Sequence, residues 1–241
     1  MRFIDDLRDC HKGKTIWIQG IGQSLCDFPR KFFDKKISIA LNWAVIAFPN
    51  CTYWHGHHEC VREYLRDEKP EFLRKSIILY PFPGPFRHGR ITQPKEFFGE
   101  LVSKPIWMKF WDTRPIPKSA FEEAIKYIVE KRTAPRGYRA SMTVAHTAMQ
   151  AAAVMGAKRI VLVGCEHRGS YARCYGMYDW RKACGGSEIF SIHDSRYQDG
   201  TRWSAEIFAK YGIEVIRYYH KDGPFYKKGY EKISWEGGEK R

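Results

Sequence analysis

The stretch that decides the fold is SMTVAHTAMQAAAVMGAKRIVLVGCE, residues 141–166. Residues 141–155 are rich in alanine and end at Gly156, a residue type that often closes a helix at its C-terminus. Residues 159–163 are a nearly continuous apolar run that ends at Gly164, which is typical of a strand buried on both faces. A helix that leads into such a strand is half of a crossover unit and predicts a parallel sheet.

The same alternation of short apolar runs and helical stretches continues on both sides. We expect further strands at residues 15–19, 36–42, 51–54, 76–80 and 214–219, and helices at 59–66 and from about 202 to 211. Ser119 and Glu122 form a capping box that opens another helix, with apolar residues at helical spacing at Phe121, Ile125, Ile128 and Val129. The sequence therefore predicts one α/β domain over residues 1–241, with a mostly parallel, Rossmann-like sheet flanked by helices.

The segment from about 80 to 118 has a different texture. Seven of the 12 prolines fall within it, among aromatic and basic residues. Proline fixes φ and removes a hydrogen-bond donor, so we expect an irregular, lid-like insertion with one edge strand around residues 106–108. A solvated insertion without a binding role is the alternative.

The composition points to a basic globular protein. The 241 residues include 41 Lys and Arg against 27 Asp and Glu, a formal charge of +14. This excess favours a polyanionic partner or substrate, although a solvated basic surface explains it equally well. No apolar run is long enough to span a membrane, and the first residues lack a secretory h-region. The chain has seven cysteines, an odd number that does not suit a framework of disulfide pairs. We therefore expect a cytoplasmic protein with reduced thiols.

Three loops at predicted strand ends carry residues suited to a binding site, because parallel sheets bind ligands beyond the carboxyl ends of their strands. Residues 20–24 (GIGQS) contain two glycines that let backbone amides approach an anion, but they match neither a P-loop nor a full dinucleotide fingerprint. Residues 164–171 place charged and aromatic side chains after the strongest strand. His193 precedes the last helix, where a histidine is a candidate general base.

A metal site is a further hypothesis at residues 55–60 (HGHHEC). His55, His57, His58 and Cys60 are potential Zn²⁺ ligands after a strand end, but their spacing is not that of a zinc finger. Hydrogen bonding by the imidazole rings is the favoured interpretation. No Asp-x-Asp pair is placed to hold a nucleotide-bound metal ion, so we predict no required metal.

The order of these motifs resembles a known group of enzymes. A strand followed by Gly20-x-Gly22-x-Ser24, a strand ending in Asn42, and an alanine-rich helix ending in Gly before a strand that closes on Gly164-Cys165-Glu166 are similar to the single-domain bacterial sialyltransferases, glycosyltransferase family forty-two. Their relatives, the archaeal-type hydroxymethylpterin pyrophosphokinase-like proteins, share the pattern. Gln23 departs from it, because proline is common at that position.

The resemblance implies roles for particular residues. Gly20, Gly22 and Ser24 would line the nucleotide phosphates, Asn42 would contact the nucleotide or donor sugar, and Ser141 or Thr143 would face the nucleotide from a helix N-terminus. Glu166 would belong to the same site. Tyr171 and Tyr175 would steady the departing phosphate, and His193 would be the catalytic base.

On this basis we expect a metal-independent, inverting glycosyltransferase that uses a nucleotide sugar, with CMP or another pyrimidine nucleotide, and needs no other cofactor. The charge favours an anionic acceptor, either a glycan or nucleic acid, as in phage-type DNA modification. Two alternatives remain open: ATP-dependent diphosphoryl transfer to a hydroxymethyl compound, which needs a metal, and a nucleic-acid-binding module without catalysis.

Overall fold

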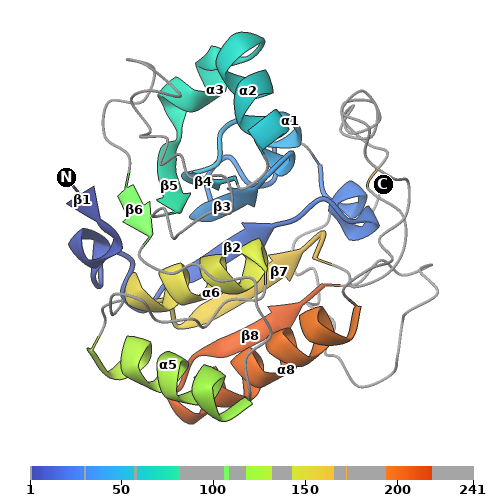
Figure 1. Cartoon of the computed structure of the whole chain (residues 1–241). Coiled ribbons are helices and arrows are strands. Elements are labelled where there is room, and N and C mark those ends of the chain that lie inside the picture. The colour runs from blue at the N-terminus through green and yellow to red at the C-terminus, as the bar shows by residue number, and fades with distance from the viewer. Residues whose placement is uncertain are drawn as a thin grey trace.

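The computed structural model describes residues 2–29, 31–56, 59–81, 106–108, 118–131, 143–165, 172 and 194–218, which form one sheet with helices on both faces (Figure 1). Its strands are β1 (Arg2–Phe3), β2 (Thr15–Gln19), β3 (Ser38–Leu41), β4 (Tyr53–His55), β5 (Ile77–Pro81), β6 (Ile106–Met108), β7 (Arg159–Val163) and β8 (Glu214–Arg217). The helices are α1 (Ala44–Ala47), α2 (Glu59–Asp67), α3 (Pro70–Lys75), α5 (Lys118–Lys131), α6 (Val144–Val154) and α8 (Asp194–Lys210), with 3-10 turns η1 (Ile4–Leu7) and η2 (Gln23–Asp27).

The strand order is β1-β6-β5-β4-β3-β2-β7-β8, and every pair of neighbours described is parallel. From β2 the chain winds outward through β3, β4, β5 and β6, and then crosses back to add β7 and β8 on the other side of β2. Strand β2 therefore lies at the topological switch point, between β3 and β7. This arrangement confirms the predicted α/β class and the parallel sheet.

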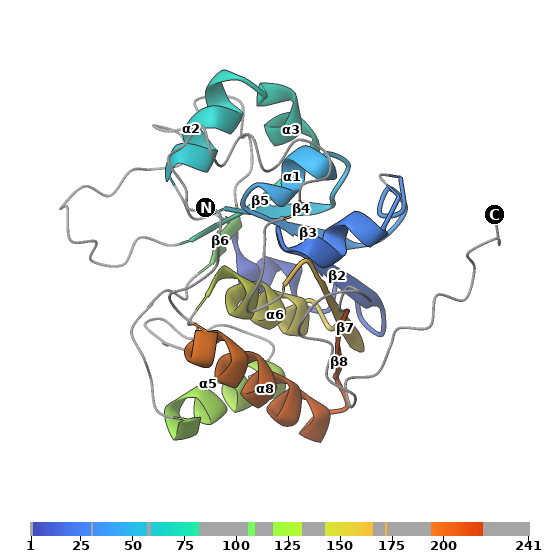
Figure 2. The ribbon, with the colours of Figure 1, turned by 90° about the vertical axis from the view of Figure 1, so that its right-hand side faces the viewer.

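The two faces of the sheet have separate cores because successive side chains of a strand point to opposite sides. Ile16 and Ile18 of β2 pack with residues of α5, α6 and α8. Trp17 packs on the other face, with residues of η2, α1 and α2. Figure 2 shows these two helical layers on opposite sides of the strands.

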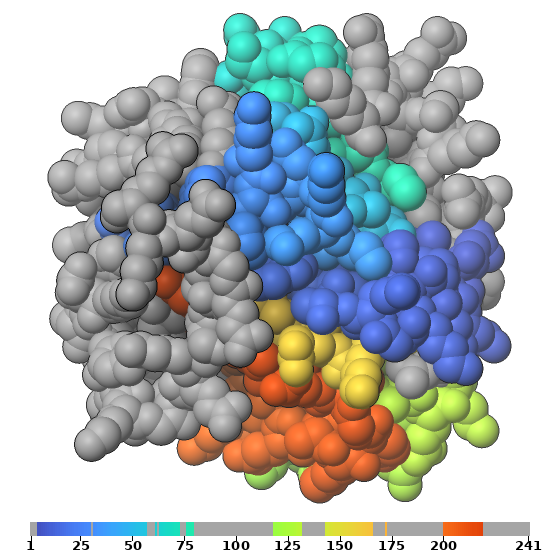
Figure 3. All heavy atoms as spheres, turned by 180° about the vertical axis from the view of Figure 1, so that it is seen from behind, coloured from blue at the N-terminus to red at the C-terminus, as the bar shows by residue number. Residues whose placement is uncertain are grey.

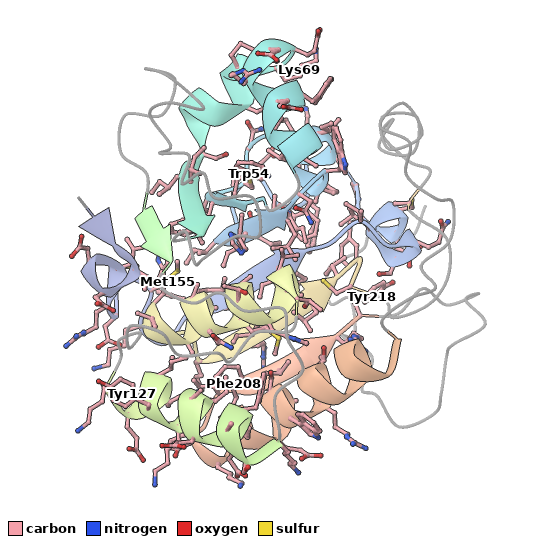
Figure 4. The ribbon with its side chains drawn as sticks, in the orientation of Figure 1. Trp54, Lys69, Tyr127, Met155, Phe208 and Tyr218 are labelled. Atoms are coloured by element: carbon pink, nitrogen blue, oxygen red, sulfur yellow. The ribbon has the colours of Figure 1, made fainter. Side chains whose placement is uncertain are left out.

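Helix α6 is buried along almost its whole length. Every residue from Ala145 to Val154 is buried, because its alanines allow close packing against the sheet, α5 and α8. The Thr143 side chain caps its N-terminus by accepting from the His146 amide, and Gly156 follows its C-terminus with φ +84°. The predicted helix and its glycine cap are confirmed. Figure 4 shows Met155 at this end and the fully buried Phe208 of α8.

The amino ends of the three strands around the switch point are joined by backbone hydrogen bonds. The Lys158 amide donates to the carbonyl oxygen of Lys14 at 3.0 Å, and the Glu214 amide donates to that of Lys158 at 2.9 Å. Figure 3 shows this region from behind, with the blue, yellow and orange parts of the chain side by side. Segments about 160 and 210 residues into the chain are thus fixed against its beginning.

Three details differ from the sequence-based expectations. Helix α8 begins at Asp194 rather than near residue 202. The strand at 106–108 exists, but it is not at the edge, because β1 pairs outside it. Cys26 is disulfide-bonded, whereas reduced thiols were expected.

Within the described chain, no helix combines the length and hydrophobicity needed to cross a membrane. The rest of the proline-rich insertion, residues 82–105 and 109–117, lies outside the described residues.

Candidate functional site at the carboxyl edge of the sheet

The loops that follow β2 and β7 are in direct contact. The Gly20 amide donates to the carbonyl oxygen of Val163 and the Gly22 amide to that of Gly164, both at 2.7 Å. A Cβ atom on Gly20 would lie 2.1 Å from the Gly164 oxygen, and Gly164 itself has φ +65°. Glycine is therefore required at both positions, one for close approach and one for its backbone conformation.

The side chain of Ser24 adds a hydrogen bond to the contact between the two loops. Its hydroxyl oxygen accepts a hydrogen bond from the Gly164 amide at 2.9 Å, and the residue is fully buried. The amide of Ala172 also donates to the carbonyl oxygen of Ile21 at 2.8 Å. The Gly22 amide and the Ser24 oxygen thus hold the two loops together, and their contact with a phosphate stays a prediction.

Gln19, the last residue of β2, is a polar side chain that the sequence did not single out. It is fully buried, and neither its Nε2 nor its Oε1 has a hydrogen-bond partner among the residues that the structure describes. Its neighbours in register on the adjacent strands are Ala40 and Val163, whose side chains cannot hydrogen-bond. The switch point therefore contains an unsatisfied amide group.

Asn42 lies at the carboxyl end of β3, next to β2, as the motif predicts. It has φ +48°, a left-handed conformation that asparagine tolerates better than most residues. Its backbone amide donates to the carbonyl oxygen of His55 at 3.0 Å, and its carbonyl oxygen accepts from Nε1 of Trp54 at 2.9 Å. These bonds place Asn42 at the same edge of the sheet as Gly20.

His55, at the end of β4, is fully buried, and its Nδ1 donates to the carbonyl oxygen of Leu79 at 2.8 Å. Burial lowers the pKa of His55 to about 4, against a smaller opposing effect of that hydrogen bond, so its ring is neutral near pH 7. Among the described residues no group of three or more His, Cys, Asp or Glu side chains could hold a metal ion. His57, His58 and the Cys60 side chain lie outside the described set, so the metal hypothesis stays open there.

The N-terminus of α6 lies at the same carboxyl edge, because α6 runs antiparallel to the strand that follows it. Thr143 caps the amide of His146, which leaves the first helical amides, those of Val144 and Ala145, without an acceptor in the helix. Such amides, with the helix dipole, favour an anion. His146 is fully buried beneath them, with Nε2 3.1 Å from the hydroxyl oxygen of Thr201 in α8.

Tyr218, directly after β8, connects this edge to η2 (Figure 4). Its ring lies 4.8 Å from that of Phe28, and its hydroxyl is hydrogen-bonded to Asp27. Burial, together with the negative charge of Asp27, raises the pKa of Tyr218 to about 12. Sequence reasoning missed this contact, because Tyr218 and Asp27 are 191 positions apart in the chain.

The other predicted site residues are Ser141, Glu166, Tyr171, Tyr175 and His193, which lie outside the described residues. The residue after His193, Asp194, begins α8, and α8 also runs antiparallel to its following strand, so its N-terminus is at the carboxyl edge. Of the predicted residues that the structure describes, Gly20, Gly22, Ser24, Asn42 and Thr143 all share that edge.

No protein-family model matches this chain, and no curated protein or solved structure is significantly similar to it. The resemblance to the sialyltransferases therefore stays a prediction from the motifs.

Proposed function

We propose that the chain is a nucleotide-sugar-dependent glycosyltransferase whose donor nucleotide binds at the carboxyl ends of β2 and β7. The observation that carries the proposal is the topology: the strand order reverses at β2, and open parallel sheets bind their ligands at such a switch point. The glycine contact between the two loops, and the N-terminus of α6 at the same edge, supply a rigid frame and a favourable potential for phosphates.

In the proposed reaction an acceptor hydroxyl attacks the anomeric carbon of the donor sugar. The bond from that carbon to the phosphate oxygen breaks, and the nucleotide leaves with the electron pair. His193 takes the hydroxyl proton as general base, and the configuration at the anomeric carbon inverts. The formal charge of +14 favours an anionic acceptor, either a glycan or nucleic acid.

Thermal unfolding with CMP, CDP, UDP, GDP, ATP and CMP-sialic acid, each with and without Mg²⁺, tests the binding half of this proposal. A ligand at one hundred times its Kd stabilises the folded state by about 2.7 kcal/mol, or roughly 5–10 °C for a domain of this size. A shift with one pyrimidine nucleotide in the absence of Mg²⁺ supports the transferase and identifies its donor class. A shift only with ATP and Mg²⁺ replaces it with the pyrophosphokinase, and no shift favours a nucleic-acid-binding module.

The catalytic half is tested with the nucleotide sugar that binds. Wild type should release the free nucleotide when an acceptor is added, and His193→Ala should bind the donor equally well but turn over at least about 100-fold more slowly. Equal turnover by His193→Ala would remove His193 from the mechanism.

A further inference from the structure

The unsatisfied side-chain amide of Gln19 carries an inference that rests on the proposed function and deepens it. Gln19 is fully buried at the end of the switch-point strand, and within the described part of the chain neither Nε2 nor Oε1 has a hydrogen-bond partner. Buried polar groups in folded proteins are nearly always paired, because burying one without a partner is unfavourable. An orphaned amide at the position where such sheets bind ligands therefore indicates a partner that binds from outside the chain.

The surroundings of Gln19 favour a neutral partner with hydrogen-bonding groups. Its register neighbours are Ala40 and Val163, and Trp17 lies two residues earlier on the same face of β2. Trp17 in turn packs against Phe28 and Phe33. A charged phosphate would lose its hydration among these groups, and the cation that lies beside them, Lys36, is over the Trp17 ring toward the amino end of the sheet. A planar, uncharged base therefore suits the Gln19 amide better.

The chemistry of a side-chain amide matches the edge of a base. Gln presents a donor and an acceptor side by side, and nucleobases present adjacent acceptors and donors, so a bidentate pair satisfies both. Gln23, four residues further along in η2, also has a buried Oε1 atom with no hydrogen-bond partner in the described ranges. Two amides thus stand on either side of Gly20 and Gly22.

We propose that Gln19 is a ligand-binding residue that hydrogen-bonds the base of the nucleotide, while the α6 N-terminus is left for the phosphates. In the unliganded protein the unpaired amide lowers the free energy of unfolding. It follows that an apolar substitution should leave the free protein as stable as before or more so, and should weaken binding of the base alone.

The experiment compares wild type with Gln19→Met, which keeps the length of the side chain but removes the amide. Melting temperature and Kd are measured with CMP, UDP, GDP and ATP and with ribose 5-phosphate, which has no base. We expect Gln19→Met to melt at or up to about 4 °C above wild type. Its Kd for the nucleotide that binds wild type should rise about tenfold or more, with the Kd for ribose 5-phosphate unchanged.

Ser38→Ala is the matched control. Ser38 is also fully buried, its Oγ also lacks a hydrogen-bond partner, and its register with Trp17 puts it on the same face as Gln19. It begins β3, however, at the amino end of the sheet. Ser38→Ala should therefore change stability in the same direction and leave every Kd unchanged.

Three outcomes overturn the inference. An unchanged nucleotide Kd in Gln19→Met means that the amide serves no ligand, as when a buried water satisfies it. Parallel losses for nucleotide and ribose 5-phosphate mean that Gln19 shapes the site without contacting the base. Binding of none of the probes to wild type removes the proposed function as well, and only this outcome does so. Should Gln19→Met fail to fold, Gln19→Asn, which withdraws the amide by one methylene, must show the same selective loss.

Discussion

Gly20 and Gly164 touch across the switch point, so closely that a Cβ atom on Gly20 would lie 2.1 Å from the carbonyl oxygen of Gly164. The two residues directly follow the paired strands β2 and β7. Their contact, rather than either loop alone, sets the geometry of the carboxyl edge at which we place the candidate site.

Gly20→Ala should be strongly destabilising. The added methyl group would meet backbone atoms, which cannot rotate away, and overpacking of this kind costs about 3 kcal/mol or more. Urea unfolding measures the loss. Gly212→Ala is the control, since Gly212 has φ +71° but nothing within 4 Å of a Cβ, so only about 1–2 kcal/mol of backbone strain is expected. A loss in Gly20→Ala no larger than that in Gly212→Ala would contradict the close contact.

Ser24→Ala should lower the free energy of unfolding by about 1–3 kcal/mol, because it leaves the buried amide of Gly164 without its acceptor. Ser204→Ala is a matched control. Ser204 is equally buried, but its hydroxyl donates to the carbonyl oxygen of Gly200, which already accepts a helical hydrogen bond. Its removal should cost less than about 1 kcal/mol. Equal losses in the two variants would show that the Ser24 hydrogen bond is not what joins the loops.

The double substitution at Gly200 and His146 should show strong coupling. Alanine in place of glycine usually stabilises a helix, but a Cβ atom on Gly200 would lie 2.4 Å from Cε1 of His146. Gly200→Ala should therefore destabilise by about 1–3 kcal/mol. In the His146→Ala background the ring is gone, and the same substitution should become neutral or stabilising. A double-mutant cycle with a coupling energy below about 0.5 kcal/mol would be inconsistent with this packing.

Stability should fall as the pH decreases from about 6.5 to about 4. Burial lowers the pKa of His55 to about 4, whereas an unfolded histidine has a pKa near 6.5, so in this window the unfolded chain binds the additional proton. This one group should make the free energy of unfolding at neutral pH about 3 kcal/mol larger than its value at the acid end of the range. Urea unfolding across this range should show a flatter profile in His55→Gln than in wild type.

His11→Gln is the comparison for that measurement. Burial also lowers the pKa of His11, but this residue is only partly buried, and its Nε2 lies 2.8 Å from the hydroxyl of Tyr53. Its substitution should flatten the profile less. If His11→Gln flattened the profile more than His55→Gln, the acid sensitivity would not come from the end of β4.

The central part of the fold was predictable because its signal is local. The alanine-rich run of α6 and the apolar run of β7 each show their structure within a few residues, and Gly156 marks the turn between them. The first turns of α8 were missed for a physical reason. Gly200 and Thr201, which contact His146 of α6, are small and not hydrophobic, so they add no apolar periodicity to this part of the helix. Strand β1 has two residues and no periodicity at all.

The candidate site was predictable only in part. Glycines and a serine after a strand are a visible motif, so Gly20, Gly22 and Ser24 could be selected from the sequence. Their hydrogen bonds, however, join the loop after β2 to the loop after β7. That second loop contains Gly164, which lies 140 positions beyond Ser24 in the chain. Gln19 resembled an ordinary polar strand end, and its burial follows from neighbours on β3 and β7 that only the sheet brings together.

The position of β2 also has a consequence for synthesis. One of its neighbours, β3, follows within a few tens of residues, but the other is β7, and the bond between Ser24 and Gly164 spans 140 residues. At about 5–20 residues per second, a ribosome needs roughly 7–28 s to deliver the second neighbour after the first part has emerged. During that interval β2, an interior strand of the finished sheet, is an edge that is open to pairing with other chains. The part of the chain from β7 onward thus covers an open sheet edge that the nascent chain would otherwise present.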